Sequence, residues 1–120
     1  MLGRVFNLCG GAPAALMVCV LGLSAATPAQ ITATWTGAAG TVSYNNPGNW
    51  DIGVVPINAG TDDYKVVIGD GVTVDYDVPD GGAGFSEVTQ LSLAAGSTID
   101  LQGRNLVVQD TADIAGTVVN

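Results

Sequence analysis

The chain has 120 residues and carries 11 acidic side chains against three basic ones, which gives a formal net charge of −8 with no histidine. This charge disfavours nucleic acid and anionic lipid as partners, because both are themselves negatively charged. Hydrophobic residues make up 48% of the chain and argue against intrinsic disorder. Because the acidic residues are spread along the sequence, we interpret them as a solvated polar surface; cation binding and halophilic solvation are the alternatives.

The segment 1–29 has the layout of a secretory signal peptide. Arg4 is the only charge before Asp51, and an apolar run at positions 14–23 leads into small residues. Ala26 and Ala29 each close an A-x-A-like cleavage site. The apolar run is shorter than the roughly 20 residues of a membrane-spanning helix. We therefore predict a secreted or cell-surface protein that meets the membrane only during export, with cleavage after Ala26 or Ala29.

Both cysteines of the chain, Cys9 and Cys19, lie in this leader. After cleavage the mature chain would hold no thiol, so neither a disulfide nor a thiolate metal site is expected to stabilise it. We expect no cofactor.

Beyond the leader, short runs of β-branched and aliphatic residues end at Gly, Asp or Asn. Apolar and polar residues alternate in such runs, and this period of two predicts half-buried strands. No longer window shows a helical stripe, since Gly and Pro recur too often. The sequence therefore predicts an all-β fold. The runs lie at residues 65–68, 72–76, 91–93 and 98–101.

Three segments of the chain can be aligned with each other, at residues 66–77, 91–102 and 106–117. The first interval is longer than the second, and the segment 77–86, rich in Gly and Pro, predicts a loop inserted into one copy. Stacked coils tolerate such insertions, because each coil contacts only its neighbours. We therefore predict the start of a parallel β-helix or solenoid, with an antiparallel β-sandwich as the alternative. The aligned columns are Ile68, Leu93 and Val108, and Val74, Ile99 and Ile114.

Residues 116–120 run into what looks like another strand, with no cap in view. An uncovered strand edge pairs readily with other chains. We therefore expect that the chain is the opening of a longer reading frame, or that it self-associates through the uncapped end.

A pattern of Trp, Gly, Asn and Pro after the leader resembles the opening of large secreted bacterial β-solenoid surface proteins built from autotransporter-associated β-strand repeats. The resemblance implies a structural or adhesive scaffold and supplies no catalytic residues. It divides the chain into a signal peptide (1–29), a capping segment (30–63) and the first solenoid repeats (64–120). The pattern consists of Trp35-Thr36-Gly37, Tyr44, Asn49-Trp50, Gly53, Pro56 and Val66-Val67-Ile68.

The capping segment holds both tryptophans of the chain, and two roles are open for them. In the first, a loop bearing Trp35, Tyr44 and Trp50 folds over the apolar end of the first coil and buries its rings. In the second, exposed rings form a carbohydrate-binding platform, with Asn45, Asn46 or Asn49 bonding to sugar hydroxyls. The partner would then be an extracellular glycan or another cell-surface molecule. The residues of this candidate site are Trp35, Tyr44, Asn49 and Trp50.

Three aspartates, Asp75, Asp77 and Asp80, are a candidate for weak Ca²⁺ binding. They do not match an EF-hand, because the fifth position of the loop is Pro79 and the twelfth is Ser86. We therefore predict no true metal site.

The usual catalytic constellations are missing from the sequence. There is no histidine, no cysteine beyond the leader and no G-x-S-x-G motif. We predict that these residues carry no enzymatic activity. A third interpretation is that they form the non-catalytic start of a polysaccharide-degrading β-helix enzyme.

Overall fold

The computed structural model describes residues 29–82 and 84–120, so that the predicted signal peptide lies, apart from Ala29, outside the described residues. Within these residues, one short 3-10 helix, η2, interrupts strands and loops. The elements are β1 (Gln30–Thr34), η2 (Pro47–Asn49), β2 (Asp63–Ile68), β3 (Thr73–Asp75), β4 (Ser86–Leu93), β5 (Thr98–Asp100), β6 (Leu106–Ile114) and β7 (Thr117–Val119).

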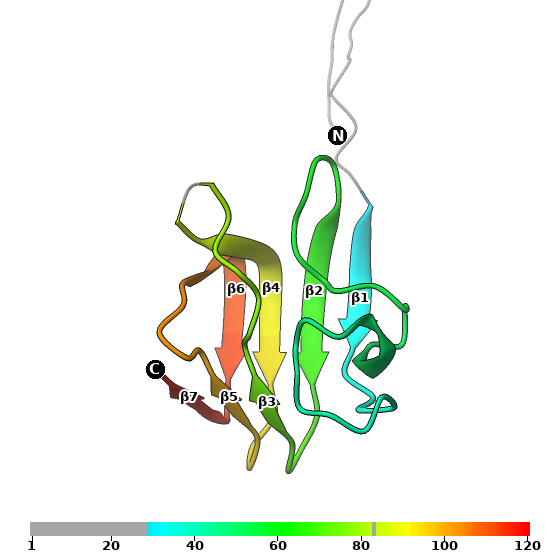
Figure 1. Cartoon of the computed structure of the whole chain (residues 1–120), viewed down its shortest axis with the longest axis vertical. Coiled ribbons are helices and arrows are strands. Elements are labelled where there is room, and N and C mark those ends of the chain that lie inside the picture. The colour runs from blue at the N-terminus through cyan, green and yellow to red at the C-terminus, as the bar shows by residue number, and fades with distance from the viewer. Residues whose placement is uncertain (1–28, 83) are drawn as a thin grey trace, which may run out of the picture.

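The strands form two parallel sheets. One has the order β1-β2-β4-β6 and the other the order β3-β5-β7. Figure 1 shows the strands of the first sheet side by side, with their arrows in one direction, and the shorter strands crossing near the ends of those arrows. The all-β prediction is confirmed. The antiparallel sandwich is wrong, since every pair of named strands is parallel; short alternating runs suit both architectures and could not separate them.

Alternation along the strands builds a single core from both sheets. In β2, Tyr64, Val66 and Ile68 are buried, while the residues between them are half-exposed. β4 and β5 show the same pattern. The predicted half-buried strands are therefore confirmed. The core consists of Ala33, Tyr44, Trp50, Tyr64, Val66, Ile68, Val74, Tyr76, Val78, Val88, Leu91, Leu93 and Ile99.

The strand register confirms the first two aligned segments and corrects the third. Ile68 lies beside Leu93, and Val74 lies beside Ile99, as the alignment predicts. However, Leu93 pairs with Ile114, while Val108 pairs with Val88. The register shifts between Val88 and Gln90, so β6 places one more residue than β4 between its paired positions. The bulge accounts for only one residue of the difference, because the alignment already matches Val108 with Leu93 and not with Val88. Apolar residues at every second position fit several shifted alignments equally well.

The turn between β6 and β7 depends on Gly116. A Cβ atom added there would lie 2.6 Å from the carbonyl oxygen of Ser97 and 2.7 Å from that of Ala94. Thr117 N donates a hydrogen bond of 2.8 Å to the same Ser97 oxygen. Only glycine allows this close approach of β7 to the turn before β5.

The predicted capping segment, residues 30–63, contains a strand of the first sheet. β1 pairs with β2 from Gln30↔Asp63 to Thr34↔Val67. The rest of the segment, the loop at residues 35–62, covers one end of the core. It lies beside β1 and β2, on the side away from β6 and β7 (Figure 1). Within residues 29–82 and 84–120, no helix is long and apolar enough to cross a membrane.

Candidate functional site

The loop at residues 35–62 helps to gather four aromatic rings at one end of the core. The ring centroids of Trp35 and Trp50 are 5.1 Å apart, and those of Tyr44 and Trp50 are 4.7 Å apart. The Tyr44 ring also lies 4.7 Å from that of Tyr76, which follows β3. All three pairs are edge-on, the arrangement that ring quadrupoles favour, at about 0.5–1.5 kcal/mol per pair. We call these four residues the aromatic end.

Two of the rings carried by the loop are buried, and their polar atoms have partners. Tyr44 has 0% of its surface exposed and Trp50 has 3%. The Trp50 Nε1–H donates to the Tyr44 carbonyl oxygen at 2.9 Å, and the Tyr44 hydroxyl donates to the Pro56 carbonyl oxygen at 2.9 Å. The predicted burial is thus confirmed for Tyr44 and Trp50, while Trp35 is half-buried.

Asn49 is also buried and holds the loop in shape. Its Nδ2 donates to the Thr41 carbonyl oxygen (3.1 Å), to Thr41 Oγ1 (2.9 Å) and to the Ser43 carbonyl oxygen (3.0 Å). Its Oδ1 accepts a hydrogen bond of 3.0 Å from Ala39 N. The amide is therefore fully occupied inside the loop.

These positions overturn most of the predicted sugar platform. Stacking on a sugar needs an accessible ring face, and hydrogen bonding to its hydroxyls needs a free amide. Tyr44, Asn49 and Trp50 are buried, so the prediction is wrong for these three. Only Trp35 is partly exposed, and its ring packs against Trp50. Trp and Asn suit a packed loop as well as a binding surface, so residue type alone could not decide between them.

The same loop also covers part of the first edge of each sheet. At β1, Thr34 N donates to Asp51 Oδ1 (2.7 Å), and Asp51 N donates to the Thr34 carbonyl oxygen (3.0 Å). At β3, Tyr44 N donates to the Asp75 carbonyl oxygen (2.9 Å), and Asp75 N donates to the Val42 carbonyl oxygen (2.8 Å). Edge groups that would otherwise be open to another strand are satisfied here.

Burial changes the acidity of two tyrosines at this end. Burial raises the pKa of Tyr44 well above 10.0, and the neighbouring Tyr76 adds to the increase. The pKa of Tyr76 is also raised by burial, although its hydrogen bond with Ser86 acts in the opposite direction. Both hydroxyls therefore stay neutral and serve as hydrogen-bonding groups at physiological pH.

Two of the three aspartates of the candidate Ca²⁺ site accept hydrogen bonds from other parts of the chain. Asp77 accepts hydrogen bonds from Ser43 Oγ (2.5 Å) and Asn45 N (2.9 Å), so it anchors the loop of the aromatic end. Asp80 accepts from Asn105 N at 3.2 Å. Within the described residues, no group of three His, Cys, Asp or Glu side chains could hold a metal. The structure thus does not bring Asp75, Asp77 and Asp80 together as a site.

The opposite end of the core, at β6 and β7, is open. An apolar groove of about 190 Å³ lies between these strands and the core. Ile114 is 40% exposed and Val118 is 47% exposed. β6 and β7 are the last strands of their sheets, so in the described part of the chain no strand pairs with their outer edges. We call this groove the open end; it is lined by Leu91, Ile99, Leu101, Leu106, Val108, Ala112, Ile114 and Val118.

Similarity to other proteins does not indicate a function for the aromatic end or for the open end. Comparisons with protein-family models, with curated proteins and with solved structures found no match. The function is therefore argued from the geometry of the chain.

Proposed function

We propose that this chain forms the first coils of a parallel β-solenoid, which serves as a secreted or cell-surface scaffold with a structural or adhesive role. The observation that carries the proposal is the path of the chain. From β2 onward, successive strands alternate between the two sheets, and from β4 onward each lies in parallel beside the strand two before it. One strand from each sheet would then make one coil.

The register supports such a repeat. Ser86 pairs with Leu106, and Ile99 pairs with Val118, so the passes of the chain measured at these two pairs are nearly equal in length. The preceding pass, from Ile68 to Leu93, is longer because the connection from β3 to β4 contains more residues. Coils of unequal length can still stack, because the extra residues lie outside the shared core.

The difference between the two ends supports growth in one direction. At the aromatic end, the loop covers the core and part of both sheet edges, whereas the open end presents apolar side chains and uncovered strands. In the proposed scaffold, a further coil or a second copy of the chain covers this groove. Self-association through the open end belongs to the same proposal.

The test is to lengthen the stack by one coil. The segment 86–105 would be duplicated directly after Asn105, so that a second copy of β4 and β5 precedes β6. A solenoid accepts this insert in register and becomes more stable, since each coil adds a nearest-neighbour interface. We expect a higher urea midpoint and an increase in β-signal by circular dichroism. A scrambled insert of the same composition is the control; equal stability of the two variants would refute the solenoid.

Export is tested separately, by expressing the full chain with its leader in a bacterial host. The expected product is outside the cytoplasm, and its mass corresponds to a start at Thr27 or Gln30. Recovery of uncleaved chain in the cytoplasm would contradict the exported role and leave the fold proposal intact.

A further inference from the structure

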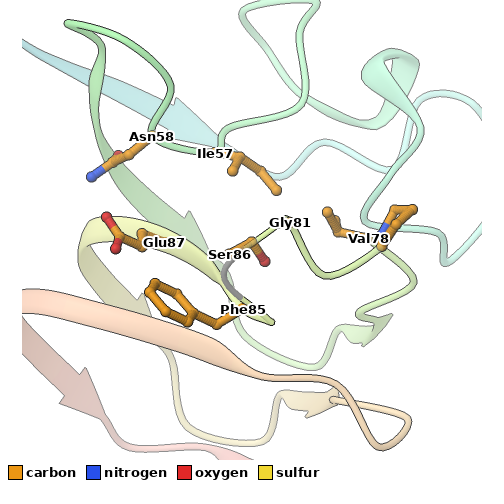
Figure 2. A pocket seen from close by; sticks show the side chains of 9 residues that line it. Ile57, Asn58, Val78, Gly81, Phe85, Ser86 and Glu87 are labelled. Carbon is orange, nitrogen blue, oxygen red and sulfur yellow. The ribbon is translucent and has the colours of Figure 1, made fainter.

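A second cavity adjoins the aromatic end, because its lining residue Ser86 bonds to Tyr76, and its lining residue Ile57 follows Pro56, the partner of the Tyr44 hydroxyl. Its volume is about 350 Å³. It opens between the end of the loop at residues 35–62 and the connection from β3 to β4, as Figure 2 shows. The lining residues are Ile57, Asn58, Val78, Pro79, Gly81, Gly82, Phe85, Ser86 and Glu87.

The walls of the cavity have one apolar and one polar side. In Figure 2, Ile57 and Val78 lie on one side of Ser86 and Phe85 on the other, and Glu87 and Asn58 lie together at one end. Phe85 and Glu87 are both half-buried, so each keeps an accessible surface. An aromatic ring beside a carboxylate offers both a stacking surface and hydrogen-bond acceptors.

A network of side chains fixes the carboxylate of Glu87. Asn58 N donates to the Glu87 carbonyl oxygen (2.8 Å), and Asn58 Nδ2 donates to Gln109 Oε1 (3.1 Å). Gln109 Nε2 in turn donates to Glu87 Oε1 at 2.6 Å. The hydrogen bonds of the described residues thus occupy Oε1 and leave Oε2 as an acceptor for a ligand.

On the other side of the cavity, a hydrogen bond fixes one wall residue, and the rim is free of side chains. The hydroxyls of Tyr76 and Ser86 share a hydrogen bond, and both residues are buried. At the rim, Gly82 has no side chain, and an added Cβ would meet nothing within 4 Å. The hydrogen bond to Tyr76 fixes the position of Ser86, so this part of the wall needs no ordering when a ligand binds.

We propose that this cavity binds one ring of a neutral pyranose sugar. Its volume lies in the range of roughly 300–1,000 Å³ that is typical of small-molecule sites. The ring of Phe85 would take the apolar C–H face of the sugar, and Glu87 Oε2 would accept hydrogen bonds from its hydroxyls. The lining contains no Lys or Arg, which disfavours an anionic ligand. This inference does not depend on the solenoid, and it places sugar binding away from the tryptophans.

The experiment is saturation-transfer NMR on the purified chain with four free sugars, namely glucose, galactose, mannose and N-acetylglucosamine. We expect transfer to at least one of them. Glu87→Gln removes the charged acceptor, and Phe85→Leu keeps an apolar side chain but removes the ring; each should weaken binding about tenfold, equivalent to about 1.4 kcal/mol. Val119→Ala, a change of an exposed residue in β7, should leave binding unchanged.

Circular dichroism and urea midpoints would show whether each variant is folded. The proposal is overturned if none of the four sugars receives transfer from the folded wild-type chain. It is equally overturned if a sugar binds but both folded variants bind it as tightly as the wild type. A signal from methyl phosphate or methylammonium in place of all four sugars would also contradict it.

Discussion

The aromatic end and the open end are two ends of the same core, and they differ in how far their side chains are covered. At the aromatic end, Tyr44 and Trp50 are almost completely buried and their polar atoms are bonded. At the open end, Ile114 and Val118 lie in β6 and β7 but remain 40% and 47% exposed. In this molecule, the sheet edges at β1 and β3 are therefore partly covered, because the loop folds back over them, whereas the edges at β6 and β7 are not.

The comparison also shows which residue types in the loop cover the end of the core and bond to an edge strand. The loop uses large rings with one polar atom, an amide with several bonds, and an aspartate that bonds to the backbone of an edge strand. Val and Ile at the open end can pack only if another strand supplies a partner. Stability should therefore be concentrated at the aromatic end, and the following variants would test this.

The largest expected effect comes from Trp50→Ala. Removing this buried ring leaves a cavity beside Tyr44 and Trp35, and such a change costs about 3–5 kcal/mol of the free energy of unfolding. Urea denaturation followed by circular dichroism measures it. A loss below about 1 kcal/mol would mean that the aromatic end does not carry the fold.

Asn49→Ala should have the next largest effect. It leaves the carbonyl groups of Thr41 and Ser43 and the N–H of Ala39 without their partner. We expect a loss of about 2–4 kcal/mol, because an unsatisfied buried group costs about 1–3 kcal/mol, whereas the groups of the exposed Thr41 and Ala39 can bond to water instead. Asn45→Ala is the matched control, since Asn45 is exposed and bonds through its backbone N–H. Equal urea midpoints for the two variants would contradict the role of Asn49.

The pH dependence of stability tests Tyr44. Because its pKa is raised in the folded state, the folded chain retains a proton that the unfolded chain loses above about pH 10. This stabilising contribution is complete below the unfolded pKa and decreases as the pH rises toward the folded pKa. We expect the urea midpoint to decrease above about pH 10, and to decrease less in Tyr44→Phe. At neutral pH this variant should lose about 1–2 kcal/mol of the free energy of unfolding, because it lacks the hydrogen bond to Pro56. Parallel pH profiles for both proteins would contradict this assignment.

The smallest effect on stability is expected at the open end. Val118→Ser changes a side chain that is 47% exposed, so it should cost less than about 1 kcal/mol. The same variant should reduce the binding of an apolar dye and the concentration-dependent association seen by sedimentation, because it places a hydroxyl in the groove. A large loss of stability without any change in association would reverse the contrast between the two ends.

Much of the strand content could be predicted from the sequence. The alternation around Val66 and Ile68, and the match of Ile68 with Leu93, appear in the structure as a buried stripe and a register pair. These features depend on neighbours in the sequence and on a regular period. The register of the third segment does not follow from this period, so the alignment matches Ile114 with Ile99 although Ile114 lies beside Leu93.

The sites were harder to predict than the strands. Trp50 and Asn49 suited either a buried loop or an exposed platform, and only their packing shows that they are buried. The cavity of Figure 2 was missed altogether, because Asn58 and Glu87 are far apart in sequence and match no motif. The only local signal was the pair of glycines before Phe85, which predicted a loop but no cavity.

The aromatic end has a consequence for the order of folding. The contacts inside its loop, residues 35–62, close short stretches of chain, such as Tyr44 with Trp50 and Ser43 with Asn49. The contact of Tyr44 with Tyr76 and the strand pairs, such as Ile68 with Leu93, join residues farther apart in sequence. Short closures have a small entropic cost and form quickly. The loop can therefore serve as a nucleus on which later strands assemble one after another, so that folding would proceed from β1 and β2 toward β6 and β7. Hydrogen exchange should then protect the amides of Asn49 and Trp50 before those of β6.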